Sequence, residues 1–189
     1  MPTAAETYFM LGHQTLWDVA RDCHRALEKA GVPHAIVGGV AVCLHGYQRN
    51  TVDVDLLVRG DDTRLIKQAL EQAGFTWSAR QAEFRSPSGI AVQCVLSGER
   101  AGKGSEVVFP DPGESKAVIE CEGLPVLTLA ALIESKLACG QGDLRRTHKD
   151  FADVVELIAI HDLDSAYARR LHKSLRKTFR ELVKHAAGG

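Results

Sequence analysis

The 189-residue chain is predicted to form an α/β fold of the α+β type, a small mixed β-sheet flanked by helices and extended by C-terminal helices. Two observations support this class. Helical periodicity opens and closes the chain, while short apolar segments separated by turn residues fill the middle. Hydrophobic residues make up 45% and charged residues 25%, which is ordinary for a globular domain. We expect residues 1–127 to form the α/β core and residues 128–189 a helical region packed on it.

The first elements follow from local patterns. Residues 14–30 carry apolar side chains at helical spacing, and Gly31 ends that helix. Residues 34–37 are predicted to form a short buried strand. Gly38 and Gly39 then break the chain before a short helix over residues 40–45.

The next strand is predicted over residues 52–58, where Asp53 and Asp55 alternate with apolar residues. Strand side chains have a period of two, so both carboxylates should face one side. Val52, Val54 and Leu56 should face the core on the other side.

The remaining elements are predicted from the same two periodicities. A helix should reach Ala73 and end at Gly74. Strands are expected near residues 75–79, 83–85, 90–96, 107–109, 117–119 and 124–126, with a glycine-rich loop over 97–105. Helices are expected over residues 129–139, 147–160 and 165–186.

The last of these helices lies in a basic segment. Residues 163–189 hold seven Lys or Arg and two acidic residues, together with an apolar stripe. The stripe favours a helix docked on the protein with its basic face in solvent, although such a face could also bind RNA or an acidic partner.

Composition excludes several classes of protein. The net charge of −1 gives no general attraction to nucleic acid or anionic membranes. No apolar run approaches the roughly 18 residues that a membrane span needs, and residues 1–10 lack the pattern of a secretory signal. The five cysteines show no zinc-ligand spacing. We therefore expect a cytoplasmic protein with no membrane partner.

The strongest chemical signal is the pair Asp53 and Asp55. Two carboxylates about 4 Å apart repel each other by about 4 kcal/mol at an effective dielectric constant near 20. A proton, a basic residue or a divalent cation can relieve this repulsion. Two oxygen ligands that leave room for water and phosphate suit Mg²⁺, whereas an isolated pair of this kind is more often solvated at a strand end.

Gly38 and Gly39 make the pair more specific. They follow an apolar strand and open a helix, an arrangement in which backbone N–H groups can approach a phosphate. Glycine at such a position can also serve only the backbone angles of a turn. Together, the glycines and the aspartates predict a phosphate and metal site.

The stretch from Ile36 to Val58, with Gly38-Gly39, Arg49, Thr51 and Asp53-Val54-Asp55, resembles the core of the DNA polymerase beta-type nucleotidyltransferase superfamily. It is similar to a branch of small bacterial nucleotidyltransferase-like proteins related to AbiEii toxins. A second stretch, around Lys136 and from Arg146 to Val154, is similar to the helical half of that group.

This resemblance implies a nucleotidyltransferase-like core that binds a nucleoside triphosphate with Mg²⁺ or Mn²⁺. Asp53 and Asp55 would be catalytic and hold the metal, while Gly38 and Gly39 would contact the phosphates. Arg49, Thr51 and Lys136 would complete the nucleotide site. The reaction would transfer a nucleoside monophosphate to a protein, RNA or small-molecule acceptor. The oligomeric state is left open, with a homodimer among the alternatives.

One position departs from the pattern of the superfamily. A third carboxylate is expected on the strand over residues 90–96, and that position holds Gln93. A glutamine carbonyl can bind a metal but cannot act as a general base. Glu83 or Glu99 could substitute only if the fold brings them inward. A nucleotide-binding or toxin–antitoxin-like module without catalysis is therefore the alternative to an enzyme.

The remaining charged candidates have two interpretations each. Arg49 could contact a phosphate or pair with the aspartates of the site. Lys136 could reach a triphosphate or extend to solvent from an amphipathic helix. Asp150 and Asp153 share a helix face, where surface ion pairs with Arg146 and Lys149 are the alternative to support of the nucleotide site.

Overall fold

A computed structural model describes residues 3–4, 6 and 14–186, so most of the first ten residues lie outside it. The helices and 3-10 turns are α2 (Gln14–Lys29), α3 (Gly38–Leu44), η1 (Gly60–Asp62), α4 (Thr63–Gln72), α5 (Leu129–Gly142), α6 (Leu144–Ile160), η2 (Ser165–Arg170), η3 (Lys173–Leu175) and α7 (Arg176–Ala186). The strands are β1 (His34–Val37), β2 (Asp53–Val58), β3 (Thr76–Ser78), β4 (Glu83–Arg85), β5 (Ala91–Leu96), β6 (Val118–Cys121) and β7 (Leu124–Leu127).

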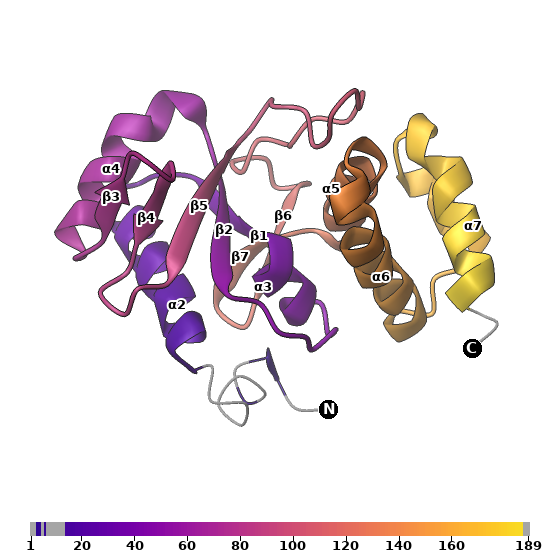
Figure 1. The fold of residues 1–189 in the computed structure, drawn as a ribbon, viewed down its shortest axis with the longest axis horizontal. Helices are drawn as coiled ribbons and strands as arrows, with labels where there is room; N and C mark the ends of the chain where they lie inside the picture. The colour runs from indigo at the N-terminus through magenta and orange to yellow at the C-terminus, as the bar shows by residue number, and fades with distance from the viewer. Residues whose placement is uncertain (1–2, 5, 7–13, 187–189) are drawn as a thin grey trace.

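Within the described residues, seven strands form one mixed sheet in the order β3-β4-β5-β2-β1-β7-β6. β2 lies at its centre, antiparallel to β1 and parallel to β5. Figure 1 shows α2 and α4 on one side of the molecule and α5, α6 and α7 gathered on the other, with β5, β2, β1, β7 and β6 between them. The predicted fold class is confirmed.

The central strands form the core because their apolar side chains are shielded on both sides of the sheet. Val54, Leu56 and Leu57 of β2 are completely buried. Val52, which we expected in the core, is instead 79% exposed. It precedes the first residue of β2, so no neighbouring strand fixes its direction, and the alternation begins only at Asp53.

The C-terminal segment differs from the single helix expected over residues 165–186. It consists of η2, η3 and α7, because the chain is extended at Leu171, whose side chain is buried. The backbone N–H of His172 donates to the carboxylate of Glu134 on α5, and a continuous helix could not make this contact. α7 packs on α6 and buries Phe179, as the apolar stripe predicted.

The segment after β5 also differs from the prediction. The strand expected over residues 107–109 is reduced to a single bridge between Arg100 and Val108.

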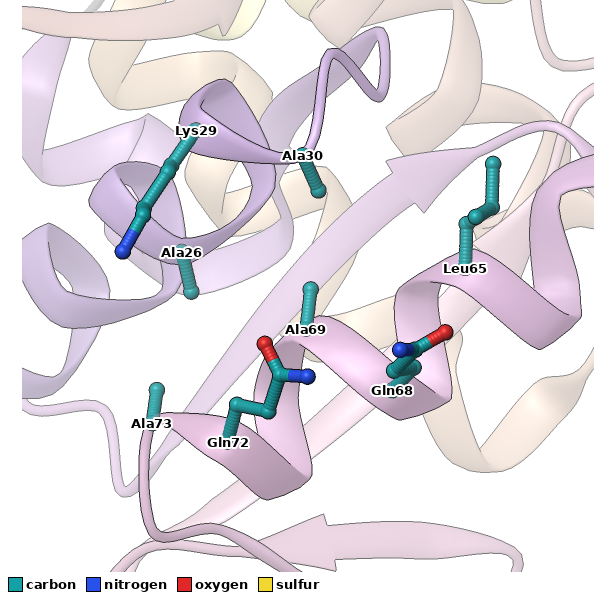
Figure 2. A pocket seen from close by; sticks show the side chains of 8 residues that line it. All are labelled: Ala26, Lys29, Ala30, Leu65, Gln68, Ala69, Gln72 and Ala73. Atoms are coloured by element: carbon teal, nitrogen blue, oxygen red, sulfur yellow. The ribbon is translucent and has the colours of Figure 1, made fainter.

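A groove of about 340 Å³ lies between α2 and α4, lined mainly by alanines and glutamines (Figure 2). None of the predicted site residues lines this groove. In the described part of the chain, no helix combines the length and apolar character that a bilayer crossing requires.

Candidate active site

The aspartates of β2 meet the glycine turn directly. Val37, the last residue of β1, is the antiparallel partner of Asp55, so Gly38 follows immediately beside the Asp55 side chain. A Cβ atom at Gly38 would lie 1.8 Å from Oδ2 of Asp55, and the φ angle of Gly38 is +65°. Both the space and the backbone angle therefore require glycine at this position.

Gly39 makes a second close approach. A Cβ atom there would lie 2.3 Å from Oγ1 of Thr51. The Thr51 hydroxyl in turn donates to Oδ1 of Asp53 at 3.2 Å. The two glycines thus allow the start of α3 to pack against Asp55 on one side and Thr51 on the other. The structure brings together five of the predicted site residues.

The environment of Asp55 disfavours a negative charge. Burial, followed by repulsion from Asp53, raises the pKa of Asp55 from 3.8 to about 6. The nearby positive charges of Lys136, Arg146 and Lys149 oppose this rise in pKa but do not cancel it. A half-buried carboxylate that is repelled by a neighbouring carboxylate is a setting that a divalent cation stabilises.

The available ligands fit a cation that shares its coordination with substrate. Among the residues that the structure describes, no group of three or more His, Cys, Asp and Glu side chains could hold a metal ion. Asp53 and Asp55 offer carboxylate oxygens, and the remaining positions would be filled by water and phosphate, as is usual for Mg²⁺.

Gln93 occupies the place where a third carboxylate was expected. It is the parallel register partner of Asp55, so the two side chains share a face of the sheet, and Gln93 is exposed. Glu83 is buried and forms an ion pair with Arg85. Glu99 is exposed in the loop after β5. The side chain beside Asp55 is therefore an amide that cannot take up a proton.

A buried ion network links the site to the helical region. The guanidinium of Arg49 donates to both carboxylate oxygens of Asp153 on α6, at 2.6 and 2.9 Å. Nζ of Lys136 lies 2.9 Å from Asp150 and 2.7 Å from Asp153. Arg146 completes the network, with its Nε donating to Asp150 at 3.1 Å.

The burial of Lys136, Asp150 and Asp153 decides between the two interpretations that the sequence allowed for each of them. Lys136 is 5% exposed and does not extend to solvent, while Asp150 and Asp153 are almost completely buried. Surface ion pairing is therefore wrong for these two aspartates, although Arg146 does pair with Asp150. The helical pattern carried a signal for burial, because Asp150 and Asp153 share a face with the apolar residues Val154 and Leu157.

The close approach at Gly38 makes a specific prediction for stability. Gly31 has nearly the same φ angle, +68°, but an added Cβ would meet nothing within 4 Å. Gly31→Ala should lower the free energy of unfolding by about 1–2 kcal/mol through backbone strain alone. Gly38→Ala should lower it by about 1–3 kcal/mol more, because Asp55 must also move. Urea unfolding of both variants measures the difference, and equal losses would contradict the contact.

Comparison with known proteins assigns the chain to a family. The sequence profile of aminoglycoside-2''-adenylyltransferase matches residues 21–153, more than half of the chain and all of the site described above. No curated protein matches the chain significantly. The matched family differs from the AbiEii-like branch suggested by the sequence pattern, while the superfamily predicted from that pattern is confirmed.

Solved structures share the fold at low sequence identity. ANT(2'')-Ia, crystallised in complex with adenylyl-2''-tobramycin, has a TM-score of 0.52 and 16% identity over 87% of this chain and 96% of its own. JHP933 from Helicobacter pylori has a TM-score of 0.53 and 15% identity over 94% and 90%. A candidate nucleotidyltransferase from Thermotoga maritima has a TM-score of 0.50 and 18% identity over 72% and 92%. On the profile match, the chain belongs to the aminoglycoside-2''-adenylyltransferase family of nucleotidyltransferases.

Proposed function

We propose that this protein transfers a nucleoside monophosphate, in the first instance AMP, from a nucleoside triphosphate to a hydroxyl group of an acceptor. The observation that carries the proposal is the contact between the Asp55 carboxylate and Gly38, with Asp53 two residues away on the same face of β2. The family profile, which spans this contact, supports adenylyl transfer.

Each part of the site has a role that follows from its geometry. Gly38 and Gly39 lack side chains, so Asp55 and Thr51 pack directly against the start of α3, and its backbone N–H groups would contact phosphates bound beside Asp53 and Asp55. Asp53 and Asp55 would hold Mg²⁺ or Mn²⁺, which would polarise the α-phosphate and acidify the acceptor hydroxyl. Thr51 fixes the Asp53 carboxylate through its hydroxyl hydrogen bond.

In the transfer, the acceptor oxygen forms a bond to the α-phosphorus while the bond from that phosphorus to the β-bridging oxygen breaks, and pyrophosphate leaves. Gln93 can accept a hydrogen bond from the acceptor hydroxyl and orient it, but cannot remove its proton. The proton would pass to solvent, so the rate should depend strongly on the acidity of the acceptor.

An alternative is a nucleotide-binding or toxin–antitoxin-like interaction module that does not transfer the nucleotide. The observation that favours it is Gln93, because a neutral amide replaces the acid that would serve as a general base. The two functions share the nucleotide site and differ only in the step that follows binding.

Label transfer separates the two functions. The protein is incubated with Mg²⁺ or Mn²⁺ and each α-labelled triphosphate, together with aminoglycosides, RNA and protein as acceptors. Transfer by the wild type that is lost in Asp55→Ala supports the enzyme. Triphosphate binding without transfer to any acceptor would support the module, and a gain of transfer in Gln93→Asp would then identify Gln93 as the cause.

A further inference from the structure

The C-terminal segment carries a charge opposite to that of the rest of the chain. Its residues 163–189 hold seven Lys or Arg and two acidic residues, which gives a net charge of +5. Residues 1–162 hold 16 Lys or Arg and 22 acidic residues, which gives −6. None of the C-terminal cations belongs to the metal and nucleotide site. Such an asymmetry within one chain is typical of proteins that bind nucleic acid or a membrane surface.

The cations of α7 lie on its outer face. Phe179 is buried and Leu182 is half-buried, because this side of α7 packs on α6, which lies between α7 and the sheet (Figure 1). Lys177, Arg180 and Lys184 are exposed and follow one another at intervals of three and four residues. Side chains at this spacing are neighbours on a helix surface. They form a row of cations, and within the described residues none of the three has an ion-pair partner.

η2 adds a planar guanidinium beside this row. It packs on α7 through the rings of Tyr167 and Phe179, whose centroids lie 5.7 Å apart. The backbone carbonyl of Arg169 also accepts a hydrogen bond from the guanidinium of Arg176 on α7. The exposed guanidinium of Arg170 lies over the ring of Tyr167, 5.5 Å from its centroid. An exposed guanidinium plane that is held in this way can stack on an unpaired base.

The packing of α7 argues against a membrane as the partner. A helix that binds a membrane surface inserts its apolar face into the lipid, whereas the apolar face of α7 is covered by α6. The row of cations together with the guanidinium plane argues for a nucleic acid. Successive phosphates match a row of positive charges, and unpaired bases offer flat faces for stacking. An acidic protein segment would use the row but not the plane.

We propose that Lys177, Arg180 and Lys184 bind the phosphate backbone of a single-stranded nucleic acid and that Arg170 stacks on one of its bases. The surface lies outside the metal and nucleotide site, so the proposal does not depend on nucleotide transfer. Each phosphate contact with a single strand contributes about −0.7 to the slope of log K against log salt concentration. Loss of the three cations should therefore make this slope shallower by about 2.

Fluorescence anisotropy measures this slope with labelled oligouridylate and oligodeoxythymidylate of about 12 nucleotides, between about 50 and 200 mM salt. The triple variant Lys177→Gln/Arg180→Gln/Lys184→Gln should bind about tenfold or more weakly at the lower salt concentration, with the shallower slope. This dependence with either oligonucleotide supports the proposal, and a difference between the two identifies the preferred sugar. A wild type that binds neither oligonucleotide would overturn the proposal.

The matched control is the triple variant Arg21→Gln/Lys29→Gln/Arg64→Gln. It removes the same charge from exposed positions on α2 and α4, on the opposite side of the molecule (Figure 1). Its affinity should change by less than about twofold, because a general electrostatic attraction alone is screened by salt over about 10 Å. An equal loss in both triple variants would show that total charge, and not the surface of α7, governs binding. Urea unfolding checks that both variants fold.

Arg170→Lys separates a nucleic acid from other polyanions, because it keeps the charge and removes the planar group. It should weaken binding of the oligonucleotides by about fivefold or more, while binding of inorganic polyphosphate changes by less than about twofold. Equal effects on oligonucleotide and polyphosphate would contradict the stacking of Arg170. Polyglutamate that binds as tightly as the oligonucleotides would identify an acidic protein as the partner and overturn the proposal.

Discussion

Lys136→Met should lower the free energy of unfolding by about 3 kcal/mol, a value typical for removal of one partner of a buried ion pair. The substitution leaves Asp150 and Asp153 buried without the ammonium group that lies within 3 Å of both. Arg49 and Arg146 each keep one of these carboxylates partnered, so we expect the lower end of the usual range. Urea unfolding at pH 7 measures the loss.

Lys67→Met is the control, because the ion pair of Lys67 with Glu71 on α4 is exposed and should contribute less than about 1 kcal/mol. Adding Asp150→Asn to Lys136→Met should recover part of the loss, since one buried negative charge is removed together with its partner. A loss below about 1 kcal/mol for Lys136→Met, equal to the control, would show that the network does not anchor the helical region.

Asp55→Asn should stabilise the metal-free protein at pH 8 by up to about 3 kcal/mol and abolish metal-dependent transfer. The pKa of Asp55 rises from 3.8 to about 6 on folding, and each unit corresponds to about 1.4 kcal/mol. The folded protein therefore binds the proton more tightly than the unfolded chain does. The favourable contribution of the protonated carboxyl is fully present below pH 3.8 and is lost as the pH rises through about 6.

The pH dependence is the diagnostic part of this prediction. In a buffer with a chelator, the stability difference between Asp55→Asn and the wild type should grow from near zero at pH 3.5 to its full value above pH 7. Asp61→Asn, at an exposed position in η1, is the control substitution. A variant that is less stable than the wild type at pH 8 would contradict the electrostatic account of Asp55. Gain of stability with loss of activity is typical of catalytic residues.

Local patterns predicted the part of the fold that surrounds the site. The strand over residues 34–37 was predicted with the bounds that the structure shows, because a short apolar run between a proline and two glycines leaves little choice. The break in the C-terminal segment was not predictable in this way. It depends on the buried side chain of Leu171 and on the bond from His172 to Glu134, which is 38 residues away in sequence.

The candidate site likewise contains one part that the sequence could predict and one part that it could not. The approach of Gly38 to Asp55 could be anticipated, because β1 and β2 are neighbouring segments and each carries its own signal. The network could not, because Arg49 and Asp153 are 104 residues apart and only the packing of α6 brings them together. Helix periodicity gave Asp153 only Arg146 and Lys149 of the same helix as ion-pair partners, whereas its partners in the structure are Arg49 and Lys136.

The central claim is that Asp53 and Asp55 hold a metal ion that binds together with a nucleoside triphosphate beside Gly38 and Gly39. Calorimetric titration of ATP into the wild type and Asp55→Asn, each with Mg²⁺ and with a chelator, tests this claim most directly. We expect the wild type to bind ATP at least about tenfold more tightly with Mg²⁺, and Asp55→Asn to lose this difference. ATP binding that is equally tight without Mg²⁺, or a Mg²⁺ dependence that persists in Asp55→Asn, would contradict the claim.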